Sequence, residues 1–267
     1  MPQPPQPQQS HPIIPNPLSH HHTPGSKMAR EEDIKTYGFA ALPRSTAALL
    51  ASRVDPKQPT ELGVDDIPLP DSPLAGKVVE YARRELPVET FNHSMRVFYY
   101  GIAIARFSFP ELLTPSWITT YLLTSLLHDI GTTPKNITST LLSFEFHGGL
   151  LVLDLLKKEG APTAQAESVA EAVIRHQDLG ETGFVTSITA VILLATIFDN
   201  VGKNAELVHP QTIVNITNAY PRMKWSQCFA HTIGQEMELK PWAHTSHLGE
   251  KEFKEGVLGN TLMEPFE

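Results

Sequence analysis

The segment Leu126-Leu127-His128-Asp129-Ile130-Gly131 decides how this chain is interpreted. It follows Tyr121-Leu122-Leu123-Thr124-Ser125, an apolar run that predicts a buried helix. A buried carboxylate is costly unless it is paired or binds a metal. Adjacent residues of a helix point about 100° apart, so His128 and Asp129 can both reach a cation beside the helix end. We therefore expect a metal site at this helix end.

Two other segments supply side chains of the same kinds. Asn92-His93-Ser94 lies upstream in a predicted helix, and Phe198-Asp199-Asn200 ends another apolar helical run downstream. The order is His, His-Asp, Asp, with gaps of 35 and 70 residues. Imidazole and carboxylate ligands suit Zn²⁺, Fe²⁺, Mn²⁺ or Co²⁺, and no cysteine lies in the set. We predict one metal per chain, bound by His93, His128, Asp129 and Asp199, which lowers the pKa of a water toward about 7 and makes hydroxide available.

The composition is that of an ordinary globular chain, with 41% hydrophobic residues among 267. The formal net charge of −8 argues against a nucleic-acid-binding surface. A single cysteine, Cys228, excludes an intrachain disulfide and fits a reducing compartment. No apolar run approaches the roughly 18 residues of a membrane span, and the N-terminus lacks the features of a signal peptide. We expect a cytoplasmic protein without a membrane partner, and a nuclear location is equally compatible with these features.

Residues 1 to about 27 are rich in Pro, Gln and His, a composition that cannot bury enough surface to fold. We predict that residues 1–36 are a disordered tail and that one domain covers residues 37–267. The tail contains His20-His21-His22, which is either a weak metal-binding tract or plain low-complexity sequence.

Helical periodicity predicts an all-α fold, with neither an alternating strand pattern nor an internal repeat. Residues 54–73, rich in Pro and Asp, are expected to form a surface loop. The predicted helices cover residues 45–53, 73–85, 87–107, 114–129, 140–159, 163–176, 187–200, 210–220 and 225–239.

Two further histidines, His147 and His176, lie in helical and mostly apolar surroundings between Asp129 and Asp199. Each is open to three interpretations: a ligand of a second metal, a group that contacts substrate or supports the first ligands, or a core histidine bonded to a carbonyl.

The order of these motifs on helices resembles the HD-domain superfamily of metal-dependent hydrolases. Asn92-His93-Ser94-Met95-Arg96 matches the first motif, Leu127-His128-Asp129-Ile130-Gly131 the second, and Asp199 the last. The resemblance implies a single HD-domain helical bundle.

Within that superfamily the chain is similar to the cyanamide hydratase branch. The similarity covers roughly residues 37–267, and its departures lie in loops. It implies an enzyme, a hydro-lyase, that hydrates cyanamide to urea with metal-bound hydroxide. Zinc is the expected metal, ahead of iron or manganese. The partner is a small nitrile, and a homo-oligomer is compatible. The similarity to this branch lies in the segments 38–43, 128–136, 144–149, Ile174-Arg175-His176-Gln177-Asp178, Asp199-Asn200-Val201-Gly202, Lys240-Pro241-Trp242 and 259–263.

The nitrile nitrogen must gain a proton during hydration, and His147, His176 or Lys135 could provide it. We rank His176 and His147 ahead of Lys135. Thr132 and Thr133 follow the metal helix directly. They either donate hydrogen bonds to the substrate or cap the helix end.

Two other functions are compatible with the sequence. The first is an HD-type phosphohydrolase acting on nucleotides, which needs cations for phosphate. Arg96, Lys135, Arg175 and Lys203 lie near the motifs, although no Gly-rich phosphate loop is present. The second is a non-catalytic HD domain that binds a small ligand, which loss of a metal ligand would favour.

Overall fold

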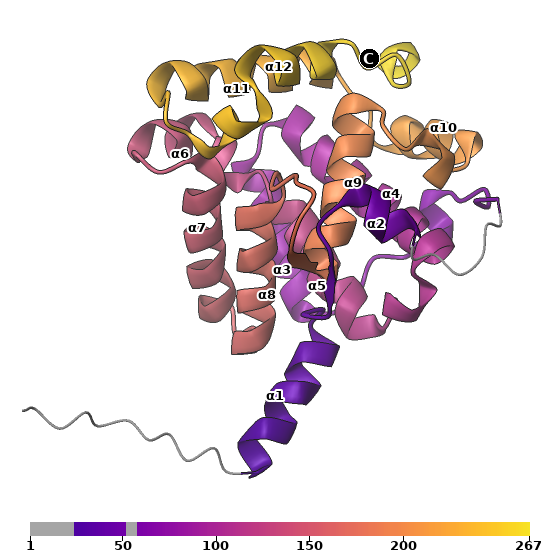
Figure 1. The fold of residues 1–267 in the computed structure, drawn as a ribbon, viewed down its shortest axis with the longest axis vertical. Coiled ribbons are helices and arrows are strands. Elements are labelled where there is room, and N and C mark those ends of the chain that lie inside the picture. The colour runs from indigo at the N-terminus through magenta and orange to yellow at the C-terminus, as the bar shows by residue number, and fades with distance from the viewer. Residues whose placement is uncertain (1–23, 52–57) are drawn as a thin grey trace, which may run out of the picture.

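The structure is a computed structural model that describes residues 24–51 and 58–267. Helices dominate it and gather into one bundle, with further helices laid across one end (Figure 1). The predicted all-α fold is confirmed. The long helices of the bundle are α3 (Pro73–Glu85), α4 (Val88–Ser108), α5 (Pro115–Leu127), α7 (Phe144–Lys158), α8 (Thr163–Arg175) and α9 (Ser187–Val201).

The helices α4 and α9 form the centre of the bundle. Of the 15 residues of α9, 13 are buried, and α4 is buried along most of its length. A helix that is apolar on all sides is stable only inside a core. Helix α5 packs against both of them. Polar side chains on these three helices are therefore cut off from bulk water and need partners inside the protein.

The end of α5 is fixed by a close backbone approach. The helix begins at the N-cap Thr114, whose side chain accepts from the Trp117 amide, and ends at Leu127 with His128 as C-cap. The 3₁₀ helix η3 (Ile130–Thr132) follows and lies against α7. A Cβ on Gly131 would lie 2.1 Å from the Phe144 carbonyl oxygen, so this contact requires glycine. It holds the His128-Asp129 pair against the start of α7.

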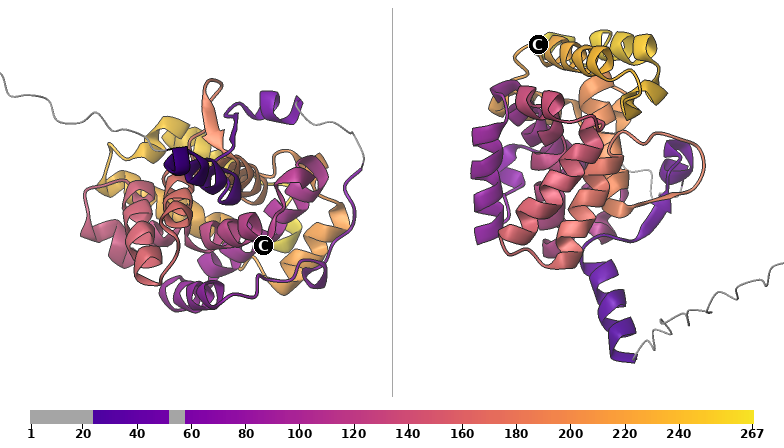
Figure 2. Two further views of the ribbon diagram at one scale, coloured as in Figure 1. Left: turned by 90° about the horizontal axis from the view of Figure 1, so that it is seen from below. Right: turned by 90° about the vertical axis from the view of Figure 1, so that its left-hand side faces the viewer.

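The helices α7 and α8 lie side by side on one flank of the bundle (Figure 2). The helices α11 (Trp225–Leu239) and α12 (Glu250–Leu258), drawn in yellow tones in Figure 1, cover one end. A second hydrophobic cluster, including Trp225 and Phe229 of α11, packs against Phe144. The shorter elements are α2 (Thr46–Ala51), α6 (Pro134–Ser139), α10 (Pro210–Ala219), η1 (Val64–Asp66), η2 (Pro110–Leu112), η4 (Ala205–Leu207), η5 (His244–Leu248) and η6 (Glu264–Phe266).

Some elements were not predicted. Strands β1 (Ala41–Pro43) and β2 (Phe184–Thr186) pair antiparallel, with Leu42 opposite Val185. Three residues are too few to give a visible alternation, which is why the sequence showed no strand. The helices α6 and α12 were also missed, and the predicted helix 140–159 begins only at Phe144.

Helix α1 (Pro24–Thr36) lies inside the segment that was predicted to be a tail, and the tail boundary stays a prediction. It projects away from the bundle (Figure 1), and its residues 27–35 are exposed. The run Met28–Lys35 contains good helix formers, and Lys27 pairs with Glu31 one turn later at 3.9 Å. Residues 1–23, with the predicted disorder and the histidine tract, lie outside the described residues.

Over residues 24–51 and 58–267, no helix combines the length and the apolar character that crossing a membrane requires.

Candidate metal centre

Three of the four predicted metal ligands come together from two helices. His93 lies in the first half of α4, and His128 and Asp129 end α5. All three side chains are buried, at 1% exposure or less. His93 Nε2 lies 3.2 Å from His128 Nε2, and Asp129 Oδ2 lies 3.3 Å from His128 Nε2 and 3.7 Å from His93 Nε2. Three ligand atoms this close together could hold one metal ion.

The other ring nitrogen of each of these histidines is held by an oxygen acceptor. His128 Nδ1 donates to the Ser125 carbonyl at 2.7 Å, and His93 Nδ1 donates to Asp199 Oδ2 at 2.7 Å. A carbonyl or an ionised carboxylate only accepts, so the proton of each neutral ring lies on Nδ1 and the Nε2 lone pair is free. Partners of this kind orient metal-binding histidines. The two lone pairs and the Asp129 carboxylate therefore form a set of acceptors that a cation would satisfy.

Asp129 carries the negative charge of this set. Among the described residues, neither carboxylate oxygen has a hydrogen-bond partner, although both are buried. Burial acts to raise the pKa of this carboxyl, but the neighbouring His128 and His176 hold it well below its usual range. An ionised carboxylate without hydrogen bonds is costly in a protein interior. The residues present therefore fit a divalent cation.

The protonation of the two ligand histidines is shifted in opposite directions. Burial lowers the pKa of His93 to about 4, although the Asp199 carboxylate opposes it. Burial also acts to lower the pKa of His128, but the adjacent Asp129 raises it overall. A metal ligand must be neutral imidazole, a form that the lowered pKa favours for His93 and that the raised pKa opposes for His128.

Asp199, the fourth predicted ligand, faces the other edge of the His93 ring, and its role as a ligand stays a prediction. Its Oδ2 faces Nδ1 of His93, the nitrogen on the other edge of the ring from Nε2. Arg96 Nη2 donates to Oδ2 at 2.9 Å, and Arg222 Nη1 donates to Oδ1 at 2.9 Å. Although burial acts to raise the pKa of this carboxyl, the two arginines hold it well below its usual range. The lone pairs of Asp199 are taken by these donors, and the group of three ligand atoms does not include it.

His176 faces the same carboxylate from the end of α8. Its Nδ1 donates to the Val173 carbonyl at 2.7 Å, so its Nε2 also carries a free lone pair. That Nε2 is buried without a hydrogen-bond partner among the described residues, and it lies 3.6 Å from Asp129 Oδ1. His93 and His128 approach the other oxygen, Oδ2. His176 is thus next to the group of three but on its own side of Asp129.

The remaining predicted site residues lie elsewhere. Lys135 is exposed on α6, and His147 lies half-buried on α7, where burial and Lys240 lower its pKa. The Thr132 hydroxyl donates to the Asp129 carbonyl at 2.7 Å, and the Thr133 hydroxyl accepts from the Asn136 amide at 3.3 Å as the N-cap of α6. These contacts lie around η3 and at the start of α6, and the expected role of the two threonines toward substrate stays a prediction.

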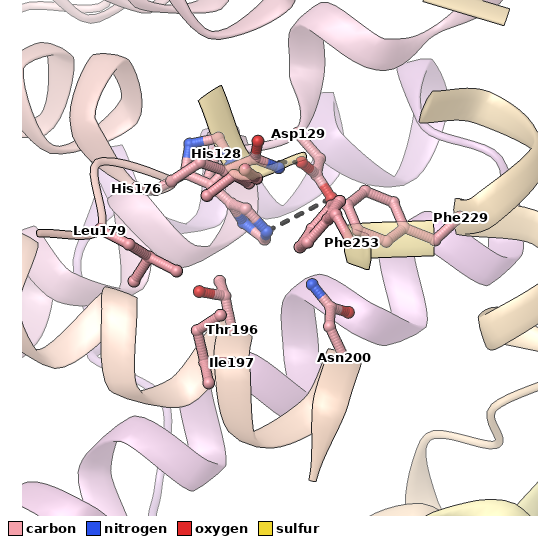
Figure 3. Close-up of a pocket in the computed structure, with 11 residues that line it drawn as sticks. His128, Asp129, His176, Leu179, Thr196, Ile197, Asn200, Phe229 and Phe253 are labelled. Atoms are coloured by element: carbon pink, nitrogen blue, oxygen red, sulfur yellow. Dashed lines mark ion pairs between the residues drawn. The ribbon is translucent and has the colours of Figure 1, made fainter. Parts of the chain in front are cut away.

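A small cavity lies beside His128, Asp129 and His176 (Figure 3). On the opposite side, Thr196 and Asn200 of α9 point into it. Only about 10 Å³ of the cavity can hold the centre of a water-sized molecule, so it admits only a very small ligand. The lining residues are His128, Asp129, His176, Gln177, Leu179, Thr196, Ile197, Asn200, Phe229, Leu248 and Phe253.

Sequence reasoning missed most of this lining. Gln177 and Asn200 each follow directly after a residue that was singled out, and Thr196 and Asn200 stand one helical turn apart on α9. Adjacency and the four-residue spacing were signals that could have found them. Phe229 and Phe253 come from α11 and α12, and nothing in their local sequence marks them.

Fold and site together define an all-α protein with a buried His-His-Asp group of metal-binding type beside a small cavity. No family model matches the chain. Two proteins of Saccharomyces cerevisiae, cyanamide hydratase DDI2 and cyanamide hydratase DDI3, are each 40% identical to it over 227 residues. The aligned region covers 85% of this chain and 97% of each relative. The chain belongs to the cyanamide hydratase family, and it is an enzyme of this kind. The wider resemblance to HD domains stays a prediction.

Proposed function

We propose that this protein hydrates cyanamide to urea at the group formed by His93, His128 and Asp129. The observation that carries the proposal is the convergence of free Nε2 lone pairs on a buried, unpartnered carboxylate at the wall of a small cavity. The family relationship to the two yeast hydratases supports the choice of substrate.

The metal is proposed to be zinc, at one ion per chain, ahead of iron or manganese. Two imidazoles and one carboxylate are a ligand set that catalytic zinc sites use, with a further position left for water or substrate. A divalent metal at these residues would supply Lewis acidity, which makes a water molecule nucleophilic near neutral pH.

Asp199 is proposed to orient His93 instead of binding the metal. The hydrogen bond from His93 Nδ1 fixes the tautomer that leaves Nε2 free. Arg96 and Arg222 hold the Asp199 carboxylate in place and keep it ionised. The last carboxylate of the motif then acts through His93.

His176 is proposed to move the proton. Hydration forms a bond between the water oxygen and the nitrile carbon, and the electron pair of one π bond of the C≡N group passes to the nitrile nitrogen, which takes a proton. The isourea formed in this way becomes urea when its hydroxyl proton moves to the same nitrogen. His176 Nε2 has a free lone pair, lines the cavity and lies beside Asp129, so it can accept a proton from water and return it to that nitrogen. His147 and Lys135 do not line the cavity, and the proposal gives them no step.

The structure does not favour a phosphohydrolase. The described lining of the cavity contains neither lysine nor arginine to bind a phosphate. Arg96 is paired with Asp199, and Arg175 is paired with Asp178 and Glu171. The non-catalytic alternative is set aside because the chain belongs to a family of enzymes.

The decisive test measures urea formed from cyanamide by the purified full-length protein, together with the metal content of the same sample. We expect turnover that needs about one zinc per chain. His176→Gln should keep the metal and lose most of the turnover, because glutamine cannot shuttle a proton. A protein that holds its metal but forms no urea would refute the proposed function.

A further inference from the structure

Asn200 lies on the cavity wall across from the metal group. It belongs to α9, one turn after Thr196, and only 5% of it is exposed. In Figure 3 its side chain points toward the space below His128 and Asp129. The activity described so far does not use it.

The orientation of the Asn200 amide is fixed by Trp225. The indole Nε1 donates to Asn200 Oδ1 at 2.7 Å. An indole nitrogen is only ever a donor, so the amide oxygen must face it and the NH₂ group must face the other way. Figure 3 shows the nitrogen of Asn200 on the cavity side. The NH₂ group of Asn200 therefore faces the cavity as a hydrogen-bond donor. Its direction follows from the bond to Trp225, so the amide oxygen and nitrogen cannot be exchanged.

Trp225 is itself held firmly. It is 2% exposed, and its ring stacks on His93 with 4.2 Å between centroids and 13° between planes. Its ring also stacks with Phe229, at 5.2 Å and 15°. A side chain packed in this way cannot turn to release Asn200, so the donor is preorganised.

We propose that Asn200 Nδ2 donates a hydrogen bond to the nitrile nitrogen of the substrate, and that Trp225 is the residue that positions it. The inference rests on the proposed hydration of cyanamide. As the water oxygen adds to the carbon, an electron pair passes to that nitrogen, and its negative charge grows until a proton arrives. A fixed N–H donor stabilises this charge more than it stabilises the neutral substrate, so its effect falls on kcat.

Asn200→Asp removes the donor while keeping the shape and the acceptor for Trp225; because it also adds a carboxylate, Asn200→Ala is measured beside it as the uncharged variant. We expect kcat to fall about 100- to 1,000-fold, with a similar fall in kcat/KM, the signature of an interaction made in the transition state. Metal content should stay at about one per chain. Asn215→Asp is the matched control, because Asn215 donates to the Leu62 carbonyl away from the cavity. It should turn over like the wild type.

Trp225→Phe tests the positioning role, because it keeps an aromatic ring against His93 and removes the N–H. It should lower kcat in the wild type but change nothing further in an Asn200→Ala background. An Asn200→Asp variant with kcat within about threefold of wild type, or an equal cost of Trp225→Phe in both backgrounds, would overturn the inference.

A readout without turnover separates this inference from the proposed function. The side-chain NH₂ resonance of Asn200, assigned by its absence in Asn200→Asp, should shift when cyanamide is added to the holoenzyme, and that of Asn215 should not. If the wild type forms no urea, the proposed function is wrong, but a shift of the Asn200 resonance still shows whether Asn200 contacts cyanamide. If the wild type forms urea and the resonance does not move, the contact is wrong.

Discussion

Replacing Asp199 by asparagine tests whether this carboxylate supports His93 or binds the metal. The side chain is fully buried and accepts from His93, Arg96 and Arg222. Asp199→Asn keeps the shape but leaves the buried Arg96 without its counter-charge, while Arg222 keeps its ion pair with Glu267.

The expected cost follows from these contacts. Removing one partner of a buried ion pair costs about 3–5 kcal/mol, because the other charge stays buried. For a domain of this size, about 2–4 °C of melting temperature corresponds to each kcal/mol. The metal-free variant should therefore melt roughly 6–20 °C below the metal-free wild type. Its metal affinity should fall about 10- to 100-fold, as for the loss of a group that orients a ligand, and excess zinc should restore binding.

The assay compares thermal unfolding of chelator-treated proteins and then measures zinc affinity by competition. Asp129→Asn is the matched counterpart, because the Asp129 oxygens have no hydrogen-bond partner among the described residues. It should abolish metal binding and leave the metal-free protein at least as stable as the wild type, since it removes a buried charge that lacks hydrogen bonds.

The sign of the stability change in the metal-free state decides between the two roles. A ligand whose charge faces an absent cation is a burden, so its neutralisation stabilises the metal-free protein. A carboxylate that balances two arginines is needed with or without metal. If metal-free Asp199→Asn melts at or above the wild-type temperature, the orienting role is refuted and Asp199 is a ligand, as its place in the motif predicted.

Purified protein should contain about one zinc per chain, and elemental analysis that finds none or two would contradict the three-atom site. Gly131→Ala should destabilise the protein by about 1–3 kcal/mol or more, since its Cβ would meet the Phe144 carbonyl, whereas Gly76→Ala in open space should stabilise it by about 0.5–1 kcal/mol in guanidinium denaturation. The hydrogen bond to Glu145 raises the pKa of His244, so this stabilisation is complete below pH 6.5 and is lost as pH rises through the raised pKa. The melting temperatures of wild type and His244→Gln should therefore converge at alkaline pH, and a constant difference would show that the pair does not titrate.

The convergence of His93, His128 and Asp129 was predictable because the motif and the predicted helices both place these residues in or beside buried helices. Each residue lies in or at the end of a helix that is apolar on all sides, and such helices pack together in a core. Residues on two of these helices are thereby confined to one small volume, and buried polar groups need partners there.

The contacts of Asp199 were not predictable from the same pattern. The motif brings Asp199 near His93, but whether it meets the ring at Nδ1 or joins Nε2 depends on its other partners. Arg96 is visible one turn after His93 on α4, whereas Arg222 lies in the connection between α10 and α11. A residue in an irregular connection leaves no periodic signal of what it contacts.

His147 shows how local context can mislead. Its neighbours are apolar, but the buried face of α7 is set by α8, which approaches at Gly149, where a Cβ would lie 2.4 Å from Ile174. Phe144, Gly148 and Gly149 are buried, while His147 is only half-buried. The contact with α8 determines which face of α7 is buried, and the residues around His147 do not reveal that contact.

Asp199 and Asn200 are neighbours on α9, so their side chains point about 100° apart. Asp199 holds the edge of the His93 ring, and Trp225 covers the face of that ring. Trp225 also fixes Asn200 at the cavity wall. One indole on α11 thus contacts both the ring that presents a metal-binding nitrogen and the amide proposed to bind the substrate.

A change that removes the Trp225 ring must disturb both contacts, whereas a change that removes only its N–H must disturb one. Trp225→Ala should therefore weaken zinc binding and lower turnover, while Trp225→Phe should lower turnover at unchanged zinc affinity. Equal zinc affinity in all three proteins would show that the stacking on His93 does not support the metal group.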